Sequence, residues 1–316
     1  MQRQTSVETG GAAVISRTSL GSSVSAAEKK SISDYLWMLV FLGPNLTIFF
    51  IFVIIPVVGA LALSLFRWDL TSAPEFVGLA NFYKIGSDQQ VLNSLYRTAT
   101  LLFGGVLPTV VGSFLIAALI NVQFIGFKIV RTLYFAPIII SFVASAMLWS
   151  WIFNPRSGPI NAVLSMFSID GPDWIGDPST AIWSVVIVLV WMRLPIGILL
   201  YLAALQNVSQ SQIEAARLDG ASSLDILRHV LWPAVRPVTQ LVTITTTQHI
   251  LFDSFDVVKV MTNGGPIDRT NVLMKHIYNT AFEQFDFGYA SALSVLLLLI
   301  VMLVAAAVFP LARVKG

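Results

Sequence analysis

Long apolar stretches dominate the chain and predict membrane-spanning helices. A helix needs about 20 mostly apolar residues to cross a hydrocarbon core of about 30 Å. Five stretches are clearly long enough, and they lie at Leu36–Leu65, Thr98–Ile120, Val130–Phe153, Ala181–Ala204 and Gly288–Pro310. A sixth stretch, Pro237–Met261, is more polar, but its hydrophilic flanks and its place in the alternation indicate that it also crosses. The pattern predicts an all-α membrane protein with six transmembrane helices.

The first 34 residues differ from the rest of the chain. They are rich in Ser, Thr, Gly and Ala, and the first aromatic residue is Tyr35, which is typical of a disordered segment. The apolar run from Tyr35 to Phe66 is too long for the apolar core of a signal peptide, which has about 7–15 residues. We therefore expect residues 1–34 to form a disordered cytoplasmic tail and residues 35–316 to form one transmembrane domain.

Basic residues near the ends of the predicted helices indicate the orientation. Lys and Arg favour the cytoplasmic side in short loops, and an even number of spans places both termini on one side. With the N-terminus inside, the cytoplasmic segments near the helix ends carry nine of these residues and the outer segments carry seven. Most aspartates, such as Asp170, Asp173 and Asp177, then lie in outer loops. This pattern favours a multi-pass protein with both termini in the cytoplasm.

The composition narrows the possible functions. Hydrophobic residues make up 56% of the chain and charged residues only 11%, whereas soluble domains carry about 25% charged residues. The net charge is +2 and the basic residues are scattered, which disfavours nucleic acid as a partner. The chain has no cysteine, and its three histidines, His229, His249 and His276, are far apart. The sequence therefore predicts no disulfide and no metal site.

The sixth stretch, Pro237–Met261, carries a polar face. At 100° per residue, six side chains fall within an arc of about 140°, and these are Thr245, Gln248, His249, Phe252, Asp253 and Asp256. Ile244 and Leu251 lie on the other side. An ionised Asp that faces lipid would be costly, so the polar face is a candidate lining for a solute pathway. The alternative is that these groups only hold neighbouring helices together.

Arg193 lies in the middle of another apolar stretch, Ala181–Ala204. A guanidinium at that depth should meet an acid or a polar pathway rather than lipid. Asp253 is a candidate partner, and Arg193 joins the candidate solute pathway.

The loop from Gln206 to Pro233 is too long for a turn and too short for a domain. It reads as two short helices that Gly220 separates, and Pro233 marks the return to the membrane. Serines can cap both helices: Ser209 or Ser211 the first, and Ser222 or Ser223 the second. Small and apolar side chains among charges suit a helix pair that docks into a groove of another protein. The alternative is a helix on the membrane surface that merely connects two spans.

The same loop carries a spaced motif. Glu214-Ala215-Ala216 is followed after three residues by Gly220 and, after nine more, by Val230, Trp232 and Pro233. This run resembles the cytoplasmic loop of permeases of binding-protein-dependent ABC importers, whose pattern is Glu-Ala-Ala, Gly and Ile-x-Leu-Pro. Here Val and Trp replace the usual Ile and Leu, and both remain large and apolar.

The resemblance covers most of residues 36–312 and points to the carbohydrate branch, which includes maltose and glycerol-phosphate permeases. It rests on several short stretches: Phe76-Val77-Gly78-Leu79 with Asn81-Phe82, Trp151-Ile152-Phe153-Asn154-Pro155, Asp219-Gly220-Ala221, Phe255-Asp256 with Thr262, Gly264-Gly265-Pro266, and Phe285-Asp286 with Gly288-Tyr289-Ala290. The large periplasmic insertion of some maltose-type subunits is absent from this sequence. The implied fold is the six-helix permease fold of ABC importers.

The resemblance implies a mechanism and a set of partners. In the family, this loop forms a coupling helix that sits in a cleft of the ATP-binding subunit. The implied coupling residues are Glu214, Ala215, Ala216, Asp219 and Gly220. The implied partners are a second permease subunit, nucleotide-binding ATPase subunits and an extracytoplasmic sugar-binding protein, in the lipid bilayer of a bacterial plasma (inner) membrane.

The sequence also indicates what this chain leaves to its partners. It contains no Gly-x-x-x-x-Gly-Lys-Ser/Thr loop, which cradles nucleotide phosphates. ATP and Mg are therefore expected on a partner subunit, and this chain is expected to bind no cofactor and to be no enzyme by itself.

The solute stays open between sugars and glycerol-phosphate derivatives. Carboxylate, amide and aromatic groups on the polar face suit a sugar, while Arg193 is weak support for a phosphorylated solute. An ion-coupled secondary transporter is the alternative function, because Asp253, Asp256 and His249 could relay protons. Such carriers commonly contain internal repeats, and we see no convincing repeat here.

Overall fold

The computed structural model describes residues 32–121 and 135–308 of the chain. The chain divides into two units, residues 1–55 and residues 56–316, and each is described by itself. Almost all of the predicted N-terminal tail, residues 1–34, lies outside the described residues, as do the inner-loop residues Lys128 and Arg131. The first described helix begins at Ile32, three residues before the predicted start of the transmembrane domain.

The described part of the first unit is a single apolar helical segment. It comprises α1 (Ile32–Phe49) and the π-helical turn η1 (Phe50–Ile54). The wide turn has a local cause. Pro56 cannot donate a backbone hydrogen bond and its ring crowds the preceding turn, and just before it the Ile55 N–H bonds to the carbonyl of Phe50, five residues back.

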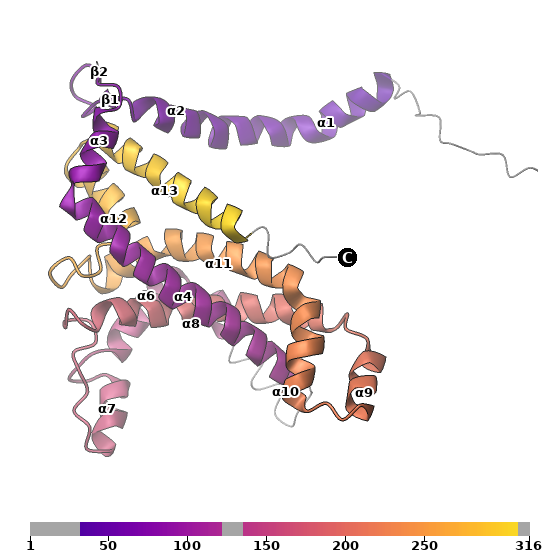
Figure 1. The fold of residues 1–316 in the computed structure, drawn as a ribbon. Helices are drawn as coiled ribbons and strands as arrows, with labels where there is room; N and C mark the ends of the chain where they lie inside the picture. Colours follow the sequence, from indigo (N-terminus) through magenta and orange to yellow (C-terminus); the bar gives the residue numbers. More distant parts are fainter. Residues whose placement is uncertain (1–31, 122–134, 309–316) are drawn as a thin grey trace, which may run out of the picture. The chain divides into compact units, whose positions relative to one another are not determined.

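The second unit is predominantly helical (Figure 1). Its elements in chain order are α2 (Ile55–Leu63), β1 (Phe66–Arg67), β2 (Glu75–Phe76), α3 (Ala80–Ser87), α4 (Gln89–Asn121), α6 (Phe142–Ile152), α7 (Pro159–Met166), α8 (Ala181–Leu205), α9 (Gln210–Leu218), α10 (Ser223–Ile226), η2 (Leu227–Leu231), α11 (Trp232–Met261), α12 (Leu273–Tyr278), η3 (Asn279–Glu283) and α13 (Phe287–Val308). The two short strands pair antiparallel, with Phe66 opposite Phe76.

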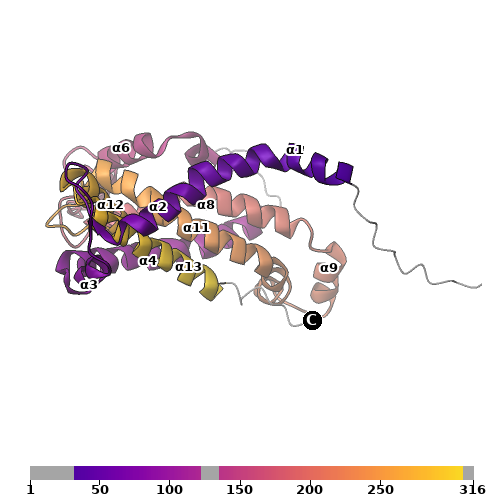
Figure 2. The ribbon, with the colours of Figure 1, turned by 90° about the horizontal axis from the view of Figure 1, so that it is seen from above.

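Helices α4, α8 and α11 pack together and form the core of this unit (Figures 1 and 2). Leu101 of α4, Val188 of α8 and Ile250 of α11 belong to one buried cluster. At one point α4 and α8 approach closely, because a Cβ on Gly197 would lie 2.8 Å from the Cβ of Ser113. Small residues that let helix backbones approach are typical of membrane helix pairs.

Within the described residues, four helical stretches are long and apolar enough to cross a membrane, namely Leu39–Leu63, Gln89–Asn121, Ala181–Leu205 and Phe287–Val308. They match four of the predicted spans. Helix α11 has 30 residues and would extend about 45 Å at 1.5 Å per residue, but its polar residues keep it out of this group. Six crossing helices therefore stay a prediction.

The predicted span Val130–Phe153 is interrupted. Its first residues lie outside the described part, residues 135–139 are helical, and the chain bends at Ile140. Ser141 then caps α6, because its hydroxyl accepts a hydrogen bond from the Ala144 N–H at 3.3 Å. Helix α6 alone has 11 residues, too few to cross a bilayer core.

Candidate functional site

The predicted loop of two short helices is present as α9 and α10. Ser209 occupies the N-cap position of α9, but its side chain makes no capping bond. Its hydroxyl instead lies 2.6 Å from that of Ser211. The predicted serine cap of the first helix is therefore wrong, while the second is confirmed, because Ser222 caps α10.

The turn between α9 and α10 is held by backbone hydrogen bonds that end α9. The Ala221 N–H bonds to the Ala216 carbonyl at 2.9 Å, and the Gly220 N–H bonds to the Arg217 carbonyl at 3.1 Å. Gly220 has φ +83°. These features form a Schellman motif, which needs a left-handed residue after the helix and therefore favours glycine.

The start of α10 fixes the other side of the same turn. The Asp225 carboxylate accepts a hydrogen bond from the Ser222 N–H at 3.0 Å, and the Ser222 hydroxyl accepts one from the Asp225 N–H at 3.3 Å. This is a reciprocal capping box. Hydrogen bonds from the Ser222 hydroxyl and amide lower the pKa of Asp225. Because both sides are fixed, residues 219–222 hold a defined conformation.

The predicted coupling residues lie together on α9 and the turn. Glu214, Ala215, Asp219 and Gly220 are exposed, and Ala216 is half-buried. Among the described residues, no ion pair involves Glu214. The arrangement presents carboxylates and small side chains on a surface that another protein can approach.

Behind this surface, the loop packs against the end of α4. Leu115 and Leu119 of α4, Ile213 of α9 and Leu227 of η2 line a largely apolar groove of about 460 Å³. Helix α10 continues through η2 into α11 without a break. The π-helical turn again precedes a proline, because the Trp232 N–H bonds to the Leu227 carbonyl just before Pro233.

Trp232 anchors the beginning of α11. Its ring lies 5.0 Å from the ring of Phe114, which lies 5.6 Å from that of Tyr201. These contacts join α11, α4 and α8. The motif's Trp in place of the usual Leu therefore fills a packed aromatic cluster.

The polar face predicted on α11 is largely open in this chain. Gln248, His249 and Phe252 are exposed, and Thr245 and Asp256 are half-buried. Leu251, expected on the other side, is 2% exposed. Five of the predicted pathway residues thus share one accessible face.

Arg193 and Asp253 lie beside that open face and form an ion pair between α8 and α11. Their side chains are 7% and 12% exposed. The Nδ1 atom of His249 lies 3.6 Å from the Asp253 carboxylate, and the Arg193 guanidinium lies 4.9 Å from the ring centre of Phe142. The pairing of Arg193 with Asp253 is confirmed.

Two features of this site were not found from the sequence. Phe142 of α6 covers Arg193, and Lys259 at the end of α11 pairs with Glu283 at 3.4 Å. Lys259 could have been predicted from the sequence, because it follows Asp256 by three residues and lies on the same helical face. Phe142 and Glu283 could not have been predicted in this way, because their contacts depend on tertiary packing.

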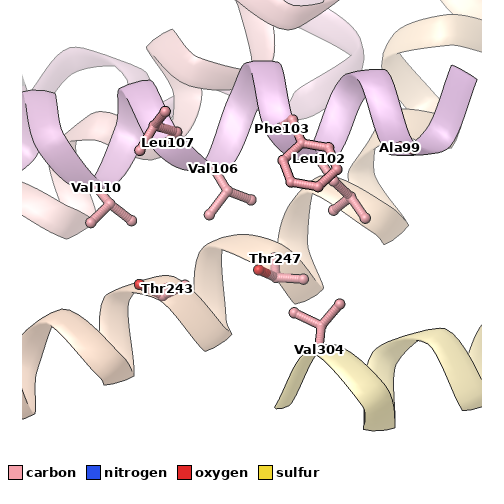
Figure 3. A pocket seen from close by; sticks show the side chains of 9 residues that line it. All are labelled: Ala99, Leu102, Phe103, Val106, Leu107, Val110, Thr243, Thr247 and Val304. Carbon is pink, nitrogen blue, oxygen red and sulfur yellow. The ribbon is translucent and has the colours of Figure 1, made fainter. Parts of the chain in front are cut away.

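A second cavity, of about 320 Å³, lies among α4, α11 and α13 (Figure 3). Its lining is apolar except for Thr243 and Thr247, and the Thr243 hydroxyl donates to the Thr239 carbonyl at 2.7 Å. None of the predicted site residues lines it. In the part of the chain that is described, no three His, Asp or Glu side chains gather into a metal site.

Comparison with known proteins decides the family. The family described as "Binding-protein-dependent transport system inner membrane component" matches residues 109–313. The chain belongs to this family. The resemblance carried by the motif from Glu214 to Pro233 is therefore confirmed.

Curated relatives of this transport permease are similar over most of their length. A trehalose/maltose transport system permease protein of Thermococcus litoralis is 34% identical over 263 residues, which cover 82% of this chain and 88% of the relative. An sn-glycerol-3-phosphate transport system permease protein of Yersinia pestis is 31% identical over 264 residues, with the same coverage.

Two solved structures have the same fold. One is a bacterial ABC transporter that imports the acidic polysaccharide alginate, with a TM-score of 0.76 and 21% identity over 90% of this chain and 97% of that chain. The other is the bacterial alginate transporter in complex with an alginate pentasaccharide-bound periplasmic protein, with a TM-score of 0.76 and 21% identity over 89% and 95%.

Proposed function

We propose that this chain is the transmembrane permease subunit of an ATP-driven sugar importer in a bacterial inner membrane. It forms half of the solute pathway, and a second permease subunit forms the other half. Nucleotide-binding subunits hydrolyse ATP with Mg, and an extracytoplasmic binding protein delivers the sugar. Both termini of this chain lie in the cytoplasm, and six helices cross the membrane. Family membership and the names of the relatives support this proposal.

The observation that carries the proposal is the fixed, exposed turn at Gly220. A coupling element must keep its shape when a partner pushes on it. The Schellman motif and the capping box provide that stiffness. The exposed Glu214 and the small Ala215 suit a groove on an ATPase subunit, in which a partner's basic side chain would pair with the carboxylate.

The same helical run that starts at this turn bears the candidate solute face. Movement of α10 would pass through η2 into α11, where Gln248, Phe252 and Asp256 lie open. Amide and carboxylate groups exchange hydrogen bonds with sugar hydroxyls, and Phe252 can cover the apolar face of a sugar ring. We propose that ATP-driven movement of α11 alternates access to this face.

The test is copurification of this chain with its ATPase and second permease, followed by measurement of ATP hydrolysis stimulated by the sugar-loaded binding protein. We compare the wild type with Glu214→Ala and Gly220→Pro, because proline holds φ near −65° and Gly220 has φ +83°. Gln212→Ala, an exposed change on the same helix, is the matched control.

We expect both variants to insert into the membrane but to lose assembly or at least about 90% of the stimulated hydrolysis, a tenfold loss that corresponds to about 1.4 kcal/mol. The control should behave as the wild type. If the two variants also assemble and hydrolyse ATP like the wild type, the loop is only a connector and the proposal fails.

An ion-coupled transporter is the second candidate, because His249 lies 3.6 Å from the Asp253 carboxylate. The two functions differ in energy source. In proteoliposomes that contain the whole complex, we expect sugar uptake to require ATP and to persist when a protonophore collapses the proton gradient. Uptake that stops with the gradient and ignores ATP would favour the ion-coupled function.

A further inference from the structure

Among the candidate pathway residues, Arg193 is the only Lys or Arg. Arg193 is the only Lys or Arg in α8, and α11 has none between Pro237 and Val258. An anionic solute needs a cation or several donors to replace its hydration shell. Whether Arg193 is available to a solute therefore decides which class of solute the candidate pathway can bind.

The structure makes Arg193 unavailable. Its side chain is 7% exposed and is paired with Asp253, which is 12% exposed. The ring of Phe142 covers the guanidinium at 4.9 Å. A solute anion could reach this charge only by breaking a buried ion pair, which would leave Asp253 as an uncompensated buried charge.

The accessible face is neutral or negative. Gln248 and Phe252 are exposed and uncharged, and the half-buried Asp256 adds a carboxylate. Further along the same face, Lys259 is paired with Glu283 at 3.4 Å. His249, the remaining titratable group here, lies 3.6 Å from the Asp253 carboxylate. Screening by salt is weak away from bulk water, so Asp256 would repel an anion.

We propose that this face of α11 selects uncharged sugars and discriminates against phosphorylated sugars and uronates, and that Asp253 maintains this selectivity by neutralising Arg193. This inference rests on the proposed function, because it requires α11 to line the pathway. The names of the relatives include two uncharged solutes, which are trehalose and maltose, and one anionic solute, which is glycerol-3-phosphate. The charge pattern assigns this chain to the first class.

The absence of cysteine from this chain permits a direct test. Gln248→Cys introduces a single thiol on the face, in the complete importer with any partner cysteines replaced. Three methanethiosulfonate reagents that differ in charge probe it: neutral methyl, anionic sulfonatoethyl and cationic trimethylammonioethyl. Each rate is divided by the rate with a free thiol in solution.

We expect the neutral reagent to react and the cationic reagent to react at least tenfold faster than the anionic one. Asp253→Asn leaves Arg193 unpaired, so this cationic-to-anionic ratio should fall at least tenfold. The matched control is the double variant Arg193→Gln with Asp253→Asn, which removes both charges and should keep a ratio within about threefold of the parent. Asp256→Asn removes the carboxylate of a half-buried residue and should also lower the cationic-to-anionic ratio. This variant replaces Asp253→Asn in the test if Asp253→Asn does not assemble.

The outcomes separate the two levels of the hypothesis. Equal or faster reaction of the anionic reagent in the parent would overturn charge selection while leaving the pathway intact. A ratio that is unchanged in both Asp253→Asn and Asp256→Asn would also overturn it. Failure of the neutral reagent to react would show that Gln248 does not meet the aqueous pathway, so the proposed pathway would fail and the inference with it.

Discussion

At the scale of single residues, His276 is buried without full hydrogen bonding. It lies in α12, is 3% exposed, and its Nε2 atom has no hydrogen-bond partner among the described residues. Burial lowers the pKa of His276, although the charges of Asp88 and Asp268 oppose the shift. The folded protein therefore favours the neutral imidazole.

This pKa shift predicts a loss of stability in acid. The unfolded chain takes up a proton as the pH falls below about 6.5, whereas folded His276 resists protonation. The stabilisation is therefore complete above that pH and is lost as the pH falls through the folded pKa. We expect the thermal unfolding midpoint to decrease between pH 8 and pH 5, and His276→Met to reduce that decrease.

The exposed His229 of η2 provides the control for this prediction. His229→Gln, a change at an exposed histidine, should reduce the decrease of the unfolding midpoint less than His276→Met does. If His276→Met and the wild type lose the same number of degrees between pH 8 and pH 5, the buried histidine does not cause the acid sensitivity.

At the scale of elements, Gly197 marks a close approach of α4 and α8. A Cβ on Gly197 would lie 2.8 Å from the Cβ of Ser113, which is 0% exposed. The Ser113 hydroxyl also donates to the Thr109 carbonyl at 2.5 Å, so this side chain is held in place. The two helices have little room to separate, because both also pack against α11.

Gly197→Ala should therefore destabilise the protein by about 1–3 kcal/mol, the usual cost of overpacking, despite the better helix propensity of Ala. A second change, Ser113→Gly, should recover most of this loss by removing the opposing Cβ. The unfolding midpoint in detergent measures both effects. Gly86→Ala, where a Cβ would meet nothing within 4 Å, is the control, and an equal loss there would contradict the packing argument.

Helix ends were predictable from the sequence where composition changes abruptly. The span predicted at Ala181–Ala204 is α8, Ala181–Leu205, and the span predicted from Gly288 is α13, which begins at Phe287. The break before α6 was missed, because hydropathy does not change at Ser141. A Ser inside an apolar run can face a neighbouring helix or cap a new one, and only the backbone path decides between them.

At the scale of the whole molecule, the site was predictable in part. The cost of burying charge in an apolar span was enough to pair Arg193 with Asp253, and helical periodicity placed Gln248 and Phe252 on one face. Periodicity could not show that Arg193 is closed off by Phe142, because that contact joins helices that are distant in sequence. Nor could it distinguish a lining residue from a helix contact, which is why Asp253 was expected on the open face.

The continuous helix from α10 through η2 to α11 links the proposed ATPase contact to the proposed solute face. Within η2, Arg228 and His229 are both exposed, so changing them alters helix stiffness with little loss of packing. Replacement of both by Gly should destabilise this part of the helix by about 1 kcal/mol for each residue relative to Ala. We expect Arg228→Gly with His229→Gly to assemble with the ATPase but to transport less sugar.

The measurement is the number of sugar molecules transported per ATP hydrolysed in proteoliposomes that contain the complete importer. We expect the double Gly variant to fall at least threefold in this ratio while it retains ATP hydrolysis. The matched control, Arg228→Ala with His229→Ala, removes the same side chains but keeps the helix stiff, so it should match the wild type. If the Gly and Ala variants show the same ratio, the stiffness of η2 does not connect ATP hydrolysis to movement of α11. If that shared ratio is below that of the wild type, the loss of the two side chains is the cause.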